Sequence, residues 1–167
     1  MVSLDQGELR YTGLRKLRVV WLADDPDDLV PITGRQGPDA LGLGLPEFRD
    51  ALAARSARRR GLKSALMDQS VLAGLGNLLV DEICWRARIR PTRAVADLDD
   101  DEVKALHRAM TQVLRTAVRH GRVSGPPRWL TGARDAPDPH CPRCGARLDH
   151  ARVAGRTTLW CPRCQPG

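Results

Sequence analysis

The strongest hydrophobic pattern lies in the second half of the chain. Apolar side chains recur there at intervals of three and four residues: Val103, Leu106, Met110, Val113, Leu114 and Ala117. This spacing places them on one face of an α-helix. Acidic residues at 99–102 precede the pattern and Gly121 follows it, as is typical of the two ends of a helix. The sequence therefore predicts a long amphipathic helix over this segment.

Shorter patterns predict the elements before this helix. Leu17, Val19 and Trp21 take every second position, which predicts a strand near residues 17–22. Residues 24–46 are rich in Asp, Pro and Gly and are expected to form a loop.

Three helical segments follow the loop. The first is expected from Pro46 toward Arg60, with one apolar side formed by Phe48, Ala51, Leu52 and Ala54. Residues 62–68 predict a short apolar helix, residues 70–76 a turn, and Asn77 the start of another helix. The chain is therefore expected to be mainly α-helical.

The chain as a whole is basic. Its 27 Lys and Arg against 20 Asp and Glu give a net charge of +7 and a pI of about 9.8. Residues 122–167 hold eight arginines and three aspartates, a net charge of +5. This balance favours an anionic partner, either nucleic acid or an acidic membrane surface. No apolar run of about 18 residues and no signal-peptide pattern occurs, so we expect a cytoplasmic protein without a membrane partner.

Four of the five cysteines form two tight pairs. Cys141 and Cys144 enclose Pro-Arg, Cys161 and Cys164 enclose Pro-Arg again, and 16 residues separate the pairs. This spacing predicts two knuckles that hold one structural zinc in a tetrahedral four-sulfur site, with a β-hairpin between them that turns at Gly155. Two disulfides or a redox pair are the alternatives, and both are disfavoured without an export signal.

The fifth cysteine, Cys84, stands alone within a predicted helix. We expect it to be a small buried apolar residue rather than a metal ligand.

A glycine-rich turn precedes the helix that starts at Asn77. Gly74 and Gly76 allow tight turns, and the free backbone N–H groups of a helix start are suited to an anion such as a DNA phosphate. The Gly-Leu-Gly-Asn sequence alone favours the alternative, an ordinary capped turn.

Together with its surroundings, this turn resembles the helix–two-turn–helix of the formamidopyrimidine-DNA glycosylase/endonuclease VIII family. The resemblance rests on residues 62–69, 74–77, 81–82, 87 and 89–91. Residues 153–165 resemble the zinc finger of that family, and residues 9–12, 15–17 and 37–41 resemble the end of its N-terminal domain and the link after it. The resemblance covers nearly the whole chain in the family's order.

The resemblance implies roles for five residues. Asn77 and Arg156 match family positions that clamp the phosphates flanking a lesion, and Lys63 matches a lysine near the same backbone. Arg15 and Leu17 match positions that fill the gap left by a flipped base. A solvated helix position for Lys63 and a strand core position for Leu17 stay open as plain structural alternatives.

The N-terminal region departs from the family. Residues 13–14 are Gly-Leu where the family has Asp-Pro, and Leu17 stands where an aromatic residue often occurs. The family's nucleophile is the amine of an N-terminal proline, followed by a glutamate, and it forms a Schiff base with the sugar. This sequence begins Met-Val-Ser, and the β-sandwich expected before Leu9 is missing. We therefore expect no catalytic residue here, no useful base excision, and only trace borohydride trapping on abasic DNA.

The expected architecture is mainly α, a helix–two-turn–helix bundle with a C-terminal β-hairpin zinc finger and a remnant N-terminal β-strand. Residues 1–45 would be the remnant and its connecting loop, 46–121 the DNA-binding domain, 122–140 a linker, and 141–167 the zinc finger. Because a linker would uncouple the two modules, Cys161→Ser is expected to disorder the tail and spare the helices.

The expected function is the DNA-binding part of a base-excision repair DNA glycosylase and AP lyase. Its partner would be double-stranded DNA, preferably damaged or abasic, bound by a monomer. The alternative is a non-enzymatic zinc-ribbon protein that binds nucleic acid. Duplex DNA is favoured over single-stranded RNA because the sequence offers no aromatic stacking platform.

Overall fold

The structure is a computed structural model that describes residues 2–4, 7–9, 25, 31, 33–123, 126 and 128–167. The chain divides into two units, Met1–Gly34 and Arg35–Gly167. In the first unit, β1 (Val2–Leu4) pairs antiparallel with β2 (Gly7–Leu9). The predicted strand near residues 17–22, and with it Arg15 and Leu17, lies outside the described residues.

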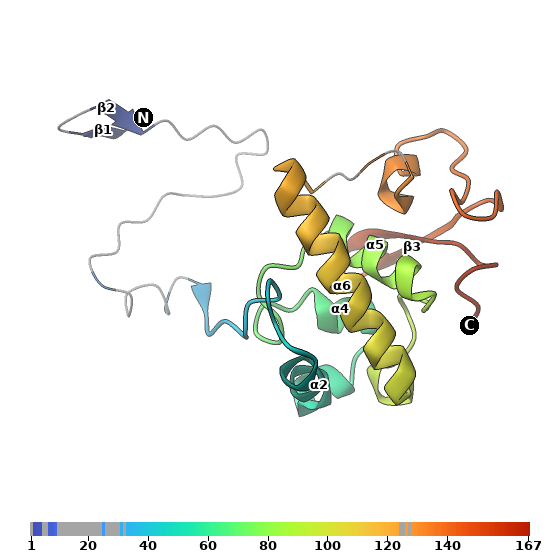
Figure 1. Cartoon of the computed structure of the whole chain (residues 1–167), viewed down its shortest axis with the longest axis horizontal. Coiled ribbons are helices and arrows are strands. Elements are labelled where there is room, and N and C mark those ends of the chain that lie inside the picture. Colours follow the sequence, from blue (N-terminus) through green and yellow to red (C-terminus); the bar gives the residue numbers. More distant parts are fainter. Residues whose placement is uncertain are drawn as a thin grey trace. The chain divides into compact units, whose positions relative to one another are not determined.

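The second unit contains helices followed by a β-hairpin, which confirms the mainly α fold (Figure 1). Its α-helices are α2 (Leu45–Ala53), α3 (Arg55–Arg58), α4 (Leu62–Leu66), α5 (Asn77–Ala87) and α6 (Asp100–His120). Two short 3₁₀ helices are η2 (Val95–Asp97) and η3 (Leu130–Ala133), and the hairpin is formed by β3 (Asp149–Val153) and β4 (Arg156–Trp160).

The predicted amphipathic helix is α6, and both of its ends are capped as the sequence indicates. The Asp99 side chain accepts a hydrogen bond from the backbone N–H of Glu102 at 2.8 Å, and the Glu102 carboxylate accepts one from the N–H of Asp99 at 3.0 Å. This reciprocal pair is a capping box. Gly121 ends the helix in the left-handed conformation with φ +62°.

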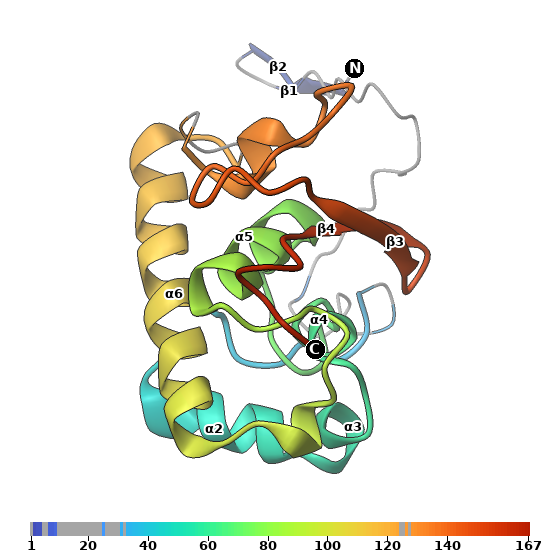
Figure 2. The same cartoon turned by 90° about the vertical axis from the view of Figure 1, so that its right-hand side faces the viewer.

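The main core forms where α5 packs against α6. Val80 and Ile83 of α5 and Leu106 and Met110 of α6 are almost fully buried in one apolar cluster. Each such side chain contributes about 1.5–3 kcal/mol by leaving water. Figure 2 shows α5 between α6 and β4, and α5 contacts both. This helix therefore joins the helical core to the hairpin.

The single helix expected from Pro46 toward Arg60 is two helices in the structure. The chain leaves the helical conformation at Ala54, where ψ is 139°, and starts again as α3. The break allows Phe48 and Leu52 of α2 and Ala57 of α3 to be buried in the same core. Ala54, expected on the apolar side, is exposed.

The expectation that residues 122–140 uncouple the helices from the zinc finger is wrong. This segment contains η3, and both Trp129 and Leu130 are buried. Leu130 packs in one cluster with Trp85 of α5 and with zinc-finger residues. The two modules therefore share a packed interface.

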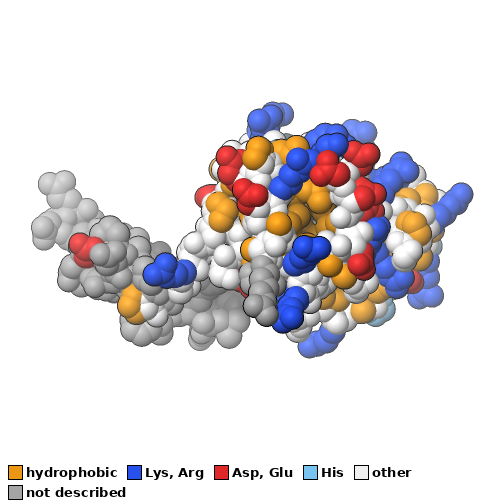
Figure 3. All heavy atoms as spheres, turned by 90° about the horizontal axis from the view of Figure 1, so that it is seen from below, with side chains coloured by type: hydrophobic (Ala, Val, Ile, Leu, Met, Phe, Trp, Pro, Cys, Tyr) orange, Lys and Arg blue, Asp and Glu red, His pale blue; other side chains and the backbone are white. Residues whose placement is uncertain are grey.

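The surface of the described part carries charges of both signs. Figure 3 shows Lys and Arg side chains on one face of the molecule interspersed with acidic and apolar ones. The net positive charge is thus not gathered into one continuous stripe on that face. Within the described residues, no helix combines the length and the apolar character needed to cross a bilayer.

Candidate zinc site and nucleic-acid interface

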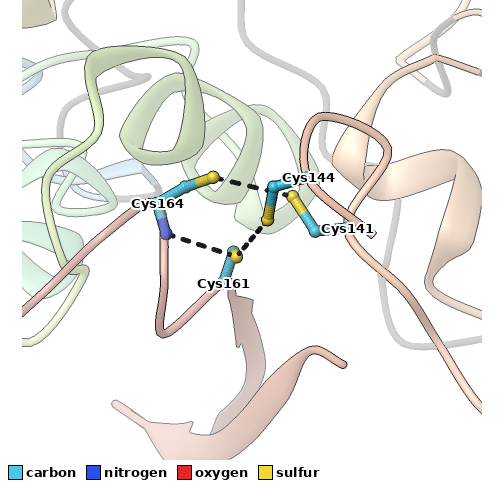
Figure 4. A group of neighbouring side chains, drawn as sticks. All are labelled: Cys141, Cys144, Cys161 and Cys164. Atoms are coloured by element: carbon cyan, nitrogen blue, oxygen red, sulfur yellow. Dashed lines mark hydrogen bonds between the residues drawn. The ribbon is translucent and has the colours of Figure 1, made fainter. Parts of the chain in front are cut away.

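The four paired cysteines converge on one point (Figure 4). Their sulfur atoms all lie within 4.8 Å of one another; Cys141 Sγ is 3.9 Å from Cys164 Sγ, and Cys144 Sγ is 3.5 Å from Cys161 Sγ. Four sulfurs at about 2.3 Å from a central zinc would be separated by about 3.8 Å. All four cysteines are free rather than disulfide-bonded. The thiols therefore fit a tetrahedral zinc ion.

The two Cys-Pro-Arg-Cys segments fold alike. The carbonyl of Cys141 accepts from the N–H of Gly145 at 2.8 Å, and that of Cys161 accepts from the N–H of Gln165 at 2.9 Å. The backbone N–H of Cys164 also donates to Cys161 Sγ at 3.3 Å. Each turn aims both of its sulfurs at the same point, as a zinc knuckle does.

One indole side chain connects the zinc site to α5. Trp85 Nε1 donates a hydrogen bond to Cys141 Sγ at 3.4 Å. Burial raises the pKa of Cys141, but this bond and backbone N–H donors outweigh burial and lower the pKa to about 7. Such donors stabilise the thiolate that binds the metal. Cys84, in contrast, is fully buried on α5, and burial raises its pKa, which confirms its interpretation as an apolar core residue.

The glycine-rich turn is braced by one amide side chain. Gln69 Oε1 accepts from the N–H of Gly74 at 3.0 Å, and Gln69 Nε2 donates to the carbonyl of Leu75 at 3.0 Å. Gly74 needs the freedom of glycine because its φ is +90°. The N-cap of α5 is Gly76, which provides no side-chain cap. The first N–H groups of α5 are therefore left without a side-chain acceptor, as an anion site requires.

The tip of the hairpin is a two-residue turn at Ala154 and Gly155. Both residues have positive φ, +48° and +72°, which is characteristic of a type I′ turn. Arg156 pairs with Val153 across this turn and its side chain is exposed. The structure thus places Arg156 at the hairpin tip, as expected from the sequence.

The carbonyl of Thr157, next to Arg156, accepts hydrogen bonds from three donors in other parts of the chain. Asn77 Nδ2 lies 3.2 Å from this oxygen, Lys63 Nζ 3.3 Å, and Arg134 Nη2 2.7 Å. These donors come from α5, α4 and the segment after η3. The structure therefore brings Lys63, Asn77 and the backbone beside Arg156 together at one point.

A carboxylate lies behind this carbonyl. Asp81 Oδ1 accepts from Lys63 Nζ at 2.6 Å, and Asp81 Oδ2 accepts from Arg134 Nη1 at 2.9 Å. The side chains of Lys63 and Asp81 have no exposed surface. Burial lowers the pKa of Lys63 and raises the pKa of Asp81, while their mutual attraction opposes both shifts. The group is a buried ionic network, because two charges out of water must be paired.

The placement of Lys63 corrects two interpretations. It is no solvated helix residue, because its side chain is 0% exposed. The direct phosphate contact expected from the resemblance does not fit this placement either, because the ammonium group is enclosed by Asp81 and Thr157.

Sequence reasoning assigned no role to Asp81 or Arg134. The sequence did contain a signal for Asp81. This carboxylate follows Asn77 by four residues on a helix that is otherwise largely apolar. A carboxylate in such a place needs a cation nearby. Arg134 carried no such signal within a segment rich in Pro and Gly.

Comparisons with known proteins identify both modules of the chain. Residues 37–125 match the formamidopyrimidine-DNA glycosylase H2TH domain, and residues 140–167 match the zinc finger found in FPG and IleRS. The formamidopyrimidine-DNA glycosylase of Heliobacterium modesticaldum is 37% identical over 97% of this chain and 63% of its own length. That of Thermomicrobium roseum is 36% identical over 95% of this chain and 58% of its own length. The chain thus spans about three fifths of the curated relatives it matches.

Solved structures give the same result. The complex between the Lactococcus lactis Fpg and DNA containing an abasic site superposes with a TM-score of 0.70 at 28% identity, over 85% of this chain and 56% of that one. A structure of MutM with DNA containing carbocyclic 8-oxo-G gives 0.69 at 28% identity, again over 85% of this chain and 56% of that one. Cys141, Cys144, Cys161 and Cys164 therefore form the structural zinc site of this fold. With a zinc finger at its C-terminal end and a domain match over more than half of its length, the chain belongs to the formamidopyrimidine-DNA glycosylase H2TH-domain family.

Proposed function

We propose that this chain is the DNA-binding part of a base-excision repair glycosylase and that it binds duplex DNA, preferably damaged or abasic, as a monomer. In this proposal Asn77 and Arg156 contact backbone phosphates on either side of the lesion. The similar Lactococcus lactis protein is in complex with DNA that contains an abasic site, which supports the same class of partner here.

One observation carries the proposal. Asn77 Nδ2 lies 3.2 Å from the carbonyl of Thr157, so the uncapped start of α5 and the hairpin tip with Arg156 meet at the same place. A helix N-terminus offers N–H donors to a phosphate, and an arginine offers charge and a fork of donors. Two such groups from different elements are suited to hold two neighbouring phosphates.

The test is binding of the purified chain to a short duplex that carries a tetrahydrofuran abasic analogue, followed by fluorescence anisotropy over a range of salt concentrations. Arg156→Ala should weaken binding to all sequences alike and reduce the salt slope by about one, because one phosphate contact is lost. Arg147→Ala is the matched control, since Arg147 is an exposed zinc-finger arginine that pairs with Asp138. A loss confined to one base sequence would show base readout and contradict the assignment.

A second comparison separates duplex binding from the zinc-ribbon alternative. The wild-type chain should prefer the abasic duplex over the intact duplex, because a distorted site is cheaper to deform, and should bind single-stranded RNA more weakly than either. Equal or tighter binding to single-stranded RNA would favour a general nucleic-acid-binding protein instead.

A further inference from the structure

We propose that Asp81 and Arg134 are positioning residues that fix the free edge of β4, and through it the orientation of Asn77 and Arg156 toward DNA phosphates. This inference rests on the proposed function for its consequence in DNA binding. Neither residue needs to touch DNA in this arrangement, because both act through the backbone of the hairpin.

The edge of β4 that faces away from β3 is paired by side chains in place of a third strand. Val153 and Arg156 flank the turn, so the backbone groups of Thr157 and Leu159 point to the free edge of the hairpin. Arg134 Nη2 donates to the Thr157 carbonyl at 2.7 Å, and the N–H of Leu159 donates to Asp81 Oδ2 at 3.4 Å.

Arg134 and Asp81 also bind each other, so these two side chains and the backbone from Thr157 to Leu159 form a closed ring of hydrogen bonds. Arg134 Nη1 lies 2.9 Å from Asp81 Oδ2, so one guanidinium spans the carboxylate and the Thr157 carbonyl. A guanidinium makes these two bonds from two separate nitrogens held in a rigid planar fork, whereas an ammonium group carries all its donors on one atom. A slip of the hairpin along its axis would break both edge bonds, so the ring fixes the register of the hairpin against α5.

Asn77 depends on the same carbonyl for its orientation. Its Nδ2 donates to Thr157, and among the described residues Asn77 Oδ1 is buried without a hydrogen-bond partner. One bond therefore holds the amide, and its second N–H is the group available to a phosphate oxygen. Asn77 and Asp81 lie four residues apart on α5, so both face β4. Displacing the Thr157 carbonyl would turn the Asn77 amide and move the neighbouring Arg156 together.

The decisive variant is Arg134→Lys. Lysine keeps the positive charge beside Asp81, but it is shorter and carries its donors on one atom, so from position 134 we expect it to lose at least one of the two bonds that Arg134 makes. We expect one bound zinc per chain and a retained helical circular dichroism spectrum, but binding to the abasic duplex weaker by about tenfold, as for the loss of one hydrogen bond to a charged group. Arg147→Lys is the matched control and should bind as the wild type does.

A double-mutant cycle separates positioning from direct contact. In an Asn77→Ala/Arg156→Ala background, Arg134→Lys should weaken binding by less than about twofold, because the groups that it positions are gone. The same tenfold loss in both backgrounds would mean that Arg134 contacts DNA itself. Unchanged binding by Arg134→Lys, where Asn77→Ala and Arg156→Ala do weaken binding, would mean that Arg134 positions neither group. Either result overturns the proposal.

A readout without DNA keeps the two proposals distinguishable. In the free protein, the NMR signals of the Asn77 side-chain amide should shift in Arg134→Lys and stay in place in Arg147→Lys. An unshifted Asn77 amide refutes positioning even where DNA binding falls. If Asn77→Ala and Arg156→Ala bind DNA normally, the proposed phosphate contacts fail, while the amide shift still decides the positioning role. If the Arg134→Lys protein contains less than one zinc per chain, the same measurements are made on the Asp81→Asn protein instead.

Discussion

The helical core and the zinc finger are stabilised in different ways. The helical core consists of apolar side chains from several helices, with Phe48, Leu66, Leu106 and Met110 at its centre. The zinc finger has only a small apolar cluster. Its buried members include the zinc ligands Cys141 and Cys161, together with Trp85 of α5 and Leu130 of η3. A module of this size cannot bury enough of its own surface to be stable, so metal binding and a neighbouring surface must supply the rest.

The interface between the two regions contains polar bonds of fixed direction beside its apolar contacts. Gln165 is fully buried; its Nε2 donates to the carbonyl of Ile89 at 2.9 Å, and its Oε1 accepts from the N–H of Cys161 at 2.9 Å. The ring of Asp81 and Arg134 adds further bonds of fixed geometry. Apolar burial makes the helical core stable, whereas these polar bonds set how the hairpin is oriented on it.

The largest effect should come from the metal. Cys161→Ser should reduce zinc well below one equivalent and disorder the hairpin, since structural zinc contributes on the order of 10 kcal/mol in small modules. Because Trp85 packs against this site, its fluorescence should shift to the red, and the helices should unfold at a lower temperature than in the wild type.

Elemental analysis, fluorescence and thermal circular dichroism measure these effects. Cys84→Ala is the control, because Cys84 is buried away from the metal site, and it should keep one zinc per chain. Helices that melt at the wild-type temperature in Cys161→Ser would show that the two regions are independent after all.

The next largest effect should come from the buried ion pair. Asp81→Leu leaves Lys63 and Arg134 without their carboxylate, and breaking a buried pair in this way costs about 3–5 kcal/mol. The Lys63→Met/Asp81→Leu double variant should recover most of that loss, because it removes the buried ammonium as well. Urea unfolding of both variants measures the difference. A single variant as stable as the wild type would contradict the importance of the network.

A core truncation should affect the helices and leave the metal in place. Leu106 is fully buried between α6 and the rest of the core, and Leu106→Ala should lower the free energy of unfolding by about 2–5 kcal/mol. Val118 is 63% exposed on the same helix, so Val118→Ala should change the free energy of unfolding by less than about 0.5 kcal/mol. Zinc content should stay at one equivalent in both. Loss of zinc in Leu106→Ala would mean that the finger depends on the whole core.

The smallest effect should come from the start of α6. Asp99→Ala removes the capping box with Glu102 and should cost about 1 kcal/mol. Asp101→Ala in the same turn is the control, because Asp101 is exposed and its ion pair with Lys104 contributes little. Chemical unfolding curves should distinguish the two. Equal destabilisation would mean that the charge of the first turn matters more than the cap.

The sequence could predict elements wherever the signal was local. The spacing of apolar residues gave α6, the residue after a Gly-x-Gly turn gave the start of α5, and the Cys-x-x-Cys pairs gave the zinc site. Each of these signals is a fixed short spacing, three or four residues within a helix and two residues within each cysteine pair, although the two cysteine pairs lie 16 residues apart. The break at Ala54 was not predictable in this way, because it is decided by the core that Phe48 and Ala57 enter together.

The sequence by itself determined the main helices, the zinc ligands and a hairpin turn at Gly155, because helix periodicity, glycine in turns and the Cys-x-x-Cys spacing are each visible in a short stretch of chain. Only the tertiary structure decided that Lys63 is buried, that Arg134 enters an ionic network, and that Trp129 packs in the helical core while Leu130 packs with the zinc finger. These outcomes join residues that are 18 to 94 positions apart in the chain. Whether such a residue is exposed or buried depends on its distant neighbours, and chain folding alone brings those neighbours together.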